Sequence, residues 1–245
     1  IYQKYFQNLE KYQLIPTHEN NVILLYFPKL KIFRKFSYFT NGKKKIFAEY
    51  RGLSWYLSRK KLNKNSIIKK FHNKNDLYKA LDTKLIQGRK MKSWDSIEKN
   101  FSYLKQVRTH YVKIFKRKKI NNIHGDLTFD NIIFKNNNIS IIDWEFYNAK
   151  PKVWGYDIAY LFLSAISIPF ILKKKISNIE ILYFKKLWKL LAKLRINKKL
   201  LSNPYLYFEN SINNDVILKQ AKNISKKKFF PFITPIKFKK FILKT

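Results

Sequence analysis

The sequence contains no cysteine, which excludes a disulfide framework, a thiolate metal site and a cysteine nucleophile. The absence of cysteine fits a reducing compartment, and we expect a cytoplasmic protein. Glycine is also scarce, since the 245 residues include five and none precedes Gly42. Acidic residues number only 15 against 52 Lys and Arg, which gives a formal net charge of +37. A hydrophobic content of 46% excludes a disordered chain and allows one large domain or two small lobes.

Long hydrophobic runs are also missing. The longest run, residues 158–172, has 15 residues and is interrupted by Ser164, Ser167 and Pro169. A membrane span needs roughly 20 apolar residues, so we expect this run to form a buried helix instead. No targeting segment is evident, and a start at Ile1 rather than Met leaves open whether residues precede it.

The excess of basic residues has two explanations. Only seven of the 52 basic residues are Arg, and the abundant Lys, Ile, Asn, Phe and Tyr are all encoded by AT-rich codons. A genome of extreme base composition would load Lys onto the surface wherever bidentate Arg geometry is not required. We therefore expect no specific nucleic-acid partner, and we keep a basic nucleic-acid-binding protein as an alternative.

Residues 1–86 indicate a small β-rich lobe with one helix. The runs 22–27 and 30–36 predict a hairpin around Pro28-Lys29, Asn41-Gly42 predicts a turn, and residues 45–61 predict an amphipathic helix. Two further short runs, 66–71 and 80–86, lead to Gly88.

Residues 87–245 indicate a larger helical lobe. Apolar residues three or four apart predict helices over 95–115, 156–167 and 178–195. Between the first two helices, 132–134 and 139–142 flank three asparagines and predict a β-hairpin. The expected fold class is α+β with two lobes.

The stretch with chemical content is HGDLTFDN at 124–131, followed by IIDWE at 141–145. It predicts that Asp126, Asn131 and Asp143 gather around one spot, with the hairpin between them. Phosphoryl transfer from a nucleotide needs such a set: a carboxylate that orients and deprotonates the attacking hydroxyl, and oxygen ligands for Mg²⁺. The competing interpretation is a solvated turn with N-capping aspartates. This interpretation does not explain why an asparagine, Asn131, follows Asp126 by five residues.

These motifs resemble the signature of the aminoglycoside phosphotransferase and choline kinase family, whose fold is protein-kinase-like. The resemblance implies an ATP- and Mg²⁺-dependent phosphotransferase with an alcohol group as acceptor. It implies Asp126 as the catalytic base, Asn131 and Asp143 as magnesium ligands, and His124 as a buried support of the loop. Asp157, in GYDIA at 155–159, is implied to begin a core helix and to tie back to the catalytic loop.

The resemblance extends to the first lobe, residues 1–86, as the nucleotide-binding lobe. In kinases a strand lysine contacts the α- and β-phosphates and is held by a glutamate on the following helix, and Lys35, 14 residues before Glu49, suits that pair. Lys31 and Arg34 are rival candidates, because a slip of one register exchanges the faces of a strand. Leu85 and Ile86 resemble the interlobe hinge that meets the adenine, although a strand ending at Gly88 is an equal interpretation.

The scarcity of glycine is the main departure from the family pattern. Without a glycine before Gly42, the first hairpin lacks the Gly-rich cover over the phosphates, and PTHENN at 16–21 is a candidate for a polar substitute. A catalytically degenerate scaffold of the same fold is therefore a second alternative.

The acceptor is expected against the helical lobe, residues 87–245. Glu145 and Trp154, with Tyr147 and Tyr156, form an acidic and aromatic group that suits a choline-like or ethanolamine-like acceptor, and sugars stack on aromatic rings too. A polycationic aminoglycoside is disfavoured by the charge of +37. The lysines at 226–228 could contact an anionic membrane. Residues 123–157 carry five acidic and three basic side chains, so the predicted site is an acidic island in a basic chain.

Overall fold

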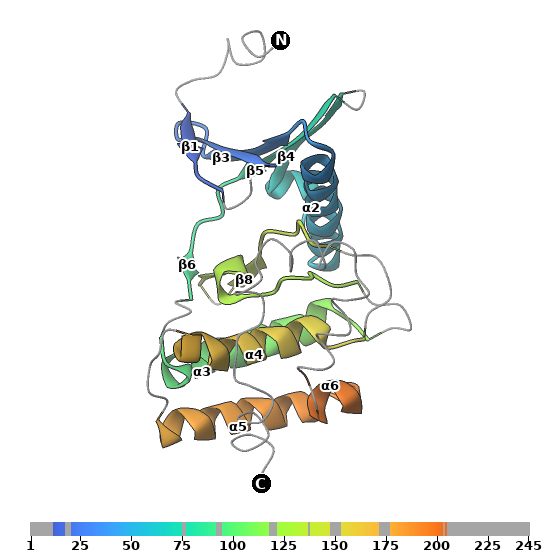
Figure 1. Ribbon diagram of the computed structural model, residues 1–245. Coiled ribbons are helices and arrows are strands. Elements are labelled where there is room, and N and C mark those ends of the chain that lie inside the picture. Colours follow the sequence, from blue (N-terminus) through green and yellow to red (C-terminus); the bar gives the residue numbers. More distant parts are fainter. Residues whose placement is uncertain are drawn as a thin grey trace. The chain divides into compact units, whose positions relative to one another are not determined.

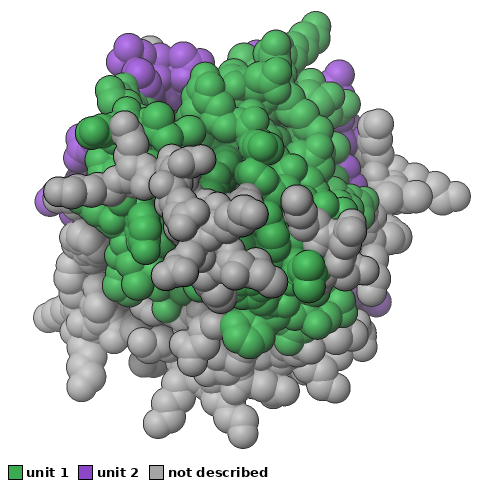
Figure 2. All heavy atoms as spheres, turned by 90° about the horizontal axis from the view of Figure 1, so that it is seen from above, with its two compact units in different colours: residues 1–87, 143–147 green, residues 88–142, 148–245 purple. Residues whose placement is uncertain are grey.

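The computed structural model describes residues 12–17, 21–74, 77–91, 95–117, 122–136, 138–147, 153–171, 177–202 and 204. The chain forms two compact units, coloured separately in Figure 2: unit 1 holds residues 1–87 and 143–147, and unit 2 holds 88–142 and 148–245. The segment 143–147 therefore clusters with unit 1, whereas the sequence suggested the helical part. The lysines at 226–228 and part of the 16–21 segment lie outside the described residues.

Unit 1 is an antiparallel sheet with one long helix (Figure 1). Its sheet has five strands in the order β1-β2-β3-β5-β4. The elements are β1 (Gln13–Ile15), β2 (Ile23–Phe27), β3 (Ile32–Ser37), α2 (Thr40–Arg59), η1 (Lys64–Ser66), β4 (Ile68–Lys74) and β5 (Tyr78–Lys84). The predicted β2–β3 hairpin is confirmed, and Lys31 closes its turn with a φ of 52°. The edge strand β1 was not predicted.

The predicted turn at Asn41-Gly42 is wrong, because helix α2 already begins at Thr40. Gly42 has a packing role rather than a turn role. A Cβ at this position would lie 2.1 Å from both the Asn21 carbonyl oxygen and the Ser37 hydroxyl oxygen. The glycine therefore lets the first turn of α2 approach the neighbouring backbone, which sequence chemistry alone cannot distinguish from a turn.

Neighbouring side chains of strand β3 lie on opposite faces of the sheet. Arg34 lies opposite Asp82 of β5, and its guanidinium donates two hydrogen bonds to that carboxylate, at 2.6 and 2.7 Å. Lys35 is on the other face, where it reaches Glu49 of α2. The alternation therefore places Arg34 and Lys35 on opposite faces of the sheet, and Lys35 is the one of the two that reaches helix α2.

Unit 2 combines helices with a small sheet of strand order β6-β7-β8. Its elements are β6 (Arg89–Lys90), α3 (Ile97–Ile114), η2 (Phe129–Asn131), β7 (Ile132–Lys135), β8 (Asn138–Ile141), α4 (Tyr156–Ile171), α5 (Asn178–Ala192) and α6 (Lys198–Ser202). The predicted α+β class is confirmed, as are helix α3 and the β7–β8 hairpin with left-handed Asn136.

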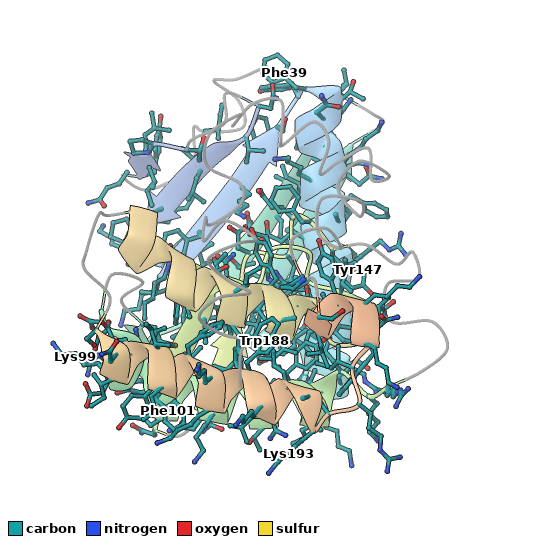
Figure 3. All side chains as sticks on the ribbon, turned by 60° about the horizontal axis from the view of Figure 1, so that its bottom comes forward. Phe39, Lys99, Phe101, Tyr147, Trp188 and Lys193 are labelled. Atoms are coloured by element: carbon teal, nitrogen blue, oxygen red, sulfur yellow. The ribbon has the colours of Figure 1, made fainter. Side chains whose placement is uncertain are left out.

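The helices of unit 2 pack through large apolar side chains. Phe101 of α3, labelled in Figure 3, meets Tyr183 of α5 with ring centroids 4.9 Å apart. Helix α5 begins with a capping box between Ser177 and Glu180. Helix α4 is buried from Tyr156 to Ala165. Within the described residues, no helix has both the length and the apolar character to cross a bilayer.

Candidate active site

The loop 122–131, between α3 and β7, is held by the carboxylate of Asp157 at the start of α4. This carboxylate accepts the backbone N–H of His124 at 2.9 Å and that of Gly125 at 3.0 Å. Gly125 has a φ of 93°, a conformation that favours glycine. Asp157 is fully buried, and burial raises its pKa to about 6 while the two backbone N–H groups oppose that rise. The expected tie from Asp157 to the loop is therefore present.

His124 is a fully buried link in the same loop. Its Nε2 lies 2.8 Å from the carbonyl oxygen of Ile142, and its Nδ1 accepts the backbone N–H of Asp126 at 3.3 Å. These partners fit a neutral imidazole that carries its proton on Nε2. The ring thus connects the predicted catalytic loop with the residue that precedes Asp143.

Asp126 and Asn131 face each other across the loop. The amide nitrogen of Asn131 donates to the Asp126 carbonyl at 2.8 Å and lies 3.4 Å from its carboxylate Oδ2. Because the nitrogen is engaged with Asp126, the oxygen of the Asn131 amide is the atom suited to a cation. The arrangement fits a hard, oxygen-binding metal such as Mg²⁺.

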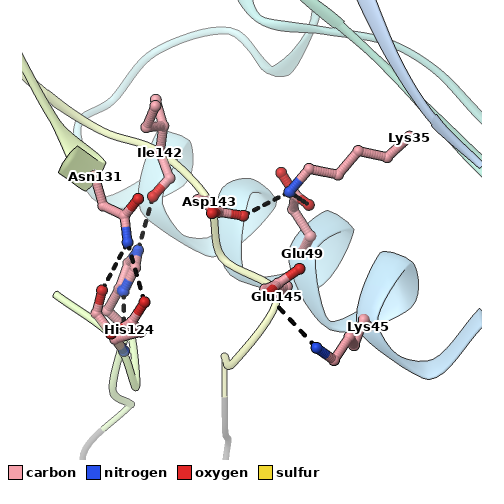
Figure 4. A network of polar contacts seen from close by, with 9 residues as sticks. Lys35, Lys45, Glu49, His124, Asn131, Ile142, Asp143 and Glu145 are labelled. Carbon is pink, nitrogen blue, oxygen red and sulfur yellow. Dashed lines mark hydrogen bonds and ion pairs between the residues drawn. The ribbon is translucent and has the colours of Figure 1, made fainter. Parts of the chain in front are cut away.

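In unit 1, the ammonium of Lys35 bridges two carboxylates (Figure 4). Its Nζ lies 2.6 Å from Oε2 of Glu49 and 2.5 Å from Oδ1 of Asp143. Burial alone would lower the pKa of Lys35, but Glu49, Asp143 and Glu145 raise it above its ordinary value. Burial raises the pKa of Glu49 to about 7, and Lys35 opposes that rise. The structure thus brings together the lysine and glutamate that the sequence paired, and adds Asp143 to them.

Asp143 itself has an unusual backbone, with a φ of 62° in the left-handed region. Few residues other than glycine adopt this conformation, although Asp is enriched among them, and it costs free energy that the surroundings must supply. Its carboxylate is 39% exposed, so it remains open to a ligand while it contacts Lys35. The preceding residue, Ile142, donates its backbone N–H to the Asn131 carbonyl at 3.0 Å. Ile142 is the neighbour of Asp143 in the chain, so the α-carbons of these two residues lie about 3.8 Å apart.

Glu145 and Trp154, the residues expected at the acceptor, lie in different compact units. Glu145 forms an ion pair with Lys45 of α2, at 3.6 Å. Trp154 is 9% exposed and its indole N–H donates to the Phe115 carbonyl, which leaves little of the ring for a ligand. Their roles toward an acceptor stay predictions.

The expected hinge residues follow β5 at the end of unit 1. Leu85 donates its backbone N–H to the Lys31 carbonyl at 2.7 Å, so this donor is engaged in the β2–β3 turn. Leu85 and Ile86 are half-buried. Gly88, at the start of unit 2, has a φ of 155°, and a Cβ there would lie 2.5 Å from the Phe134 carbonyl oxygen. Contact with adenine stays a prediction for both hinge residues.

Sequence reasoning missed the residues that hold segment 143–147 to unit 1. Trp144 is fully buried, with its ring centroid 5.2 Å from that of Tyr56. A Cβ at Gly52 would lie 2.7 Å from the Cβ of Tyr147. The spacing of Lys45 and Glu49, four residues apart on one helix face, was the available signal for Lys45.

No group of three or more His, Asp or Glu side chains capable of holding a metal occurs in the part of the chain that the structure describes. The expected magnesium ligands are instead one amide oxygen and one carboxylate. They belong to different compact units, Asn131 to unit 2 and Asp143 to unit 1, so joint binding of Mg²⁺ by the two stays a prediction.

No family model and no curated protein matches the sequence. Among solved structures, the GDP and kanamycin complex of APH(2'')-IIIa aligns with 93% of this chain and 97% of its own, at 12% identity and a TM-score of 0.42. The GDP complex of wild-type aminoglycoside 2'-phosphotransferase-IIIa gives the same values. Choline kinase LicA from Streptococcus pneumoniae aligns with 92% of this chain and 98% of its own, at 12% identity and a TM-score of 0.37. These are the two kinds of enzyme that the 124–145 motif resembles, and at this level the likeness says nothing of what the chain binds.

Proposed function

We propose that the chain is a small-molecule kinase that transfers the γ-phosphoryl group of ATP to the hydroxyl of a small acceptor. The observation that carries the proposal is the ammonium of Lys35 between Glu49 and Asp143. A lysine fixed by a helix glutamate beside a metal-binding aspartate is the arrangement that protein kinases use for nucleotide phosphates.

The chemistry follows from the loop 122–131. Asp126 would accept the proton of the attacking hydroxyl, and Asn131 holds the Asp126 carbonyl and carboxylate in place through its amide nitrogen. Lys35 would bind the phosphates through its ammonium. Mg²⁺, held by the Asn131 amide oxygen and the Asp143 carboxylate, would neutralise charge on the transferred group.

The acceptor is proposed as a choline-like, ethanolamine-like or sugar-like alcohol. Tyr147 and Phe146 follow Asp143 closely in the chain but are as buried as Trp154, so this proposal rests on the residue types that follow the 141–145 motif and not on an open aromatic surface. Aromatic faces bind quaternary ammonium groups and also stack on sugar rings. A screen of these alcohols with ATP and Mg²⁺, read as ADP release, distinguishes them.

The test compares Asp126→Asn with Asp130→Asn, a matched change at an exposed position of the neighbouring turn η2. We expect Asp126→Asn to lower kcat by about 10²–10⁴-fold, the usual contribution of a general base, and Asp130→Asn to leave it unchanged. Turnover that survives in Asp126→Asn refutes the assigned base. A wild-type chain that binds ATP and Mg²⁺ in a thermal-shift assay, yet turns over no acceptor, would favour the degenerate scaffold.

A further inference from the structure

One stripe of helix α2 is occupied by the segment 143–147. Its members Lys45, Glu49, Gly52 and Tyr56 are four, three and four residues apart, so they lie along a single face of the helix. All four meet the segment, either directly or through Lys35, as described above. The stripe therefore meets the segment along about three turns of helix.

The contacts of the stripe differ in chemistry from end to end. Lys45 forms an ion pair with Glu145, and Glu49 reaches Asp143 through the shared ammonium of Lys35 (Figure 4). Further along α2, Gly52 leaves room for the side chains of Trp144 and Tyr147. Such a set of contacts can hold the left-handed backbone of Asp143, because strained conformations persist only where their surroundings fix them.

The two ion pairs of the segment are not equivalent under the proposed function. Lys35 would turn toward the nucleotide phosphates and Asp143 toward the metal, so their 2.5 Å contact weakens when the ligand binds. Lys45 and Glu145 have neither of these tasks. Their side chains are 16% and 19% exposed, and the Lys45 ammonium lies 4.8 Å from the centroid of the Phe146 ring. Partial burial makes such a pair stronger than a fully exposed one.

We propose that Lys45 is a positioning residue that holds segment 143–147 on helix α2 through Glu145 and so presents Asp143 to the metal. The inference rests on the proposed function for its catalytic meaning, while the attachment itself is a property of unit 1. Groups that orient metal ligands typically change metal affinity by about 10–100-fold when they are removed.

The experiment measures the Mg²⁺ concentration for half-maximal ADP release, at saturating ATP and acceptor, together with the Mg²⁺ dependence of the ATP-induced thermal shift. We expect Lys45→Met to raise both midpoints about tenfold with kcat at saturating Mg²⁺ nearly unchanged, and Lys45→Arg to restore them. Lys64→Met is the control, because Lys64 also lies over a ring of unit 1, 4.5 Å from the centroid of Tyr50. Unchanged midpoints in Lys45→Met overturn the proposal.

A double-mutant cycle tests the attachment without any ligand. Lys45→Met, Glu145→Gln and the double variant are unfolded in urea. We expect the free energy of unfolding of the double variant to be no lower than that of the less stable single variant, because either change alone already breaks the ion pair. Additive losses would overturn the attachment. If the wild-type chain shows neither turnover nor an ATP shift, the proposed function fails while this cycle still decides whether Lys45 holds the segment.

Discussion

Replacing Asp157 by Ala removes the group that fixes the loop 122–131. The carboxylate is fully buried and accepts two backbone N–H groups, from His124 and Gly125. Hydrogen bonds to a charged group contribute about 1.5–3 kcal/mol each, and each buried N–H left without a partner costs about 1–3 kcal/mol. Relief of the burial that raises the pKa of Asp157 offsets part of this loss. We expect the free energy of unfolding to fall by about 2–5 kcal/mol, measured by urea unfolding followed by circular dichroism.

The pH dependence of Asp157→Asn gives the sign of the effect. The pKa of Asp157 rises from 3.8 to about 6 on folding, so between these values the folded chain binds more protons than the unfolded chain. Its contribution to stability is therefore present at pH 4 and is lost as the pH rises to about 6, by about 3 kcal/mol at 1.36 kcal/mol per pH unit. The stability difference between wild type and Asp157→Asn should shrink by that amount from pH 4 to pH 7. Asp130→Asn removes the same charge from an exposed position and serves as control. A difference that grows with pH would refute the reasoning, because it would mean that the backbone N–H groups outweigh burial.

Three further substitutions test the packing by urea unfolding. Gly52→Ala should lower the free energy of unfolding by about 1–2 kcal/mol. The new methyl group would lie 2.7 Å from the Cβ of Tyr147, and this overpacking costs more than the gain of about 1 kcal/mol in helix propensity. A variant more stable than the wild type would contradict this. Gly88→Ala should cost about 1–3 kcal/mol, since its φ of 155° and the crowded backbone both disfavour a side chain, and no change would show that the boundary between the units relaxes freely. Asp82→Asn should cost about 3–5 kcal/mol by leaving the buried Arg34 charge without its carboxylate, and a loss below about 1 kcal/mol would contradict the pairing.

Local patterns predicted the regular elements of both units well. Helix α3 followed from apolar residues three or four apart, and the β2–β3 hairpin from branched and aromatic runs around Pro28. The turn at Asn41-Gly42 failed because Gly42 serves a contact with residues 21 and 37, outside the local sequence. Local chemistry therefore identified elements, while the role of an individual glycine required the tertiary structure.

The choice among Lys31, Arg34 and Lys35 shows the same limit within the site. Strand alternation separates Arg34 from Lys35 but does not say which of them faces the helix. That choice is made by Asp82, 48 residues away along the chain, whose carboxylate binds Arg34 in a bidentate pair. Burial alone would raise the pKa of Asp82, but hydrogen bonds from Arg34 and His72 lower it, so the pair is charged. With Arg34 engaged there, Lys35 is left to meet Glu49.

The 15 acidic residues explain more about the site than the net charge of +37 does. Among the 15 carboxylates, four of the five in residues 123–157 have specific partners: Asp157 binds backbone N–H groups, Asp143 binds Lys35, Glu145 binds Lys45, and Asp126 faces the amide of Asn131. Each of these contacts needs a negative charge or an acceptor at that position, so lysine cannot take its place. Surface lysines carry no such requirement, and their number can follow base composition. The carboxylates of residues 123–157 are therefore retained where a specific partner requires an acceptor or a negative charge.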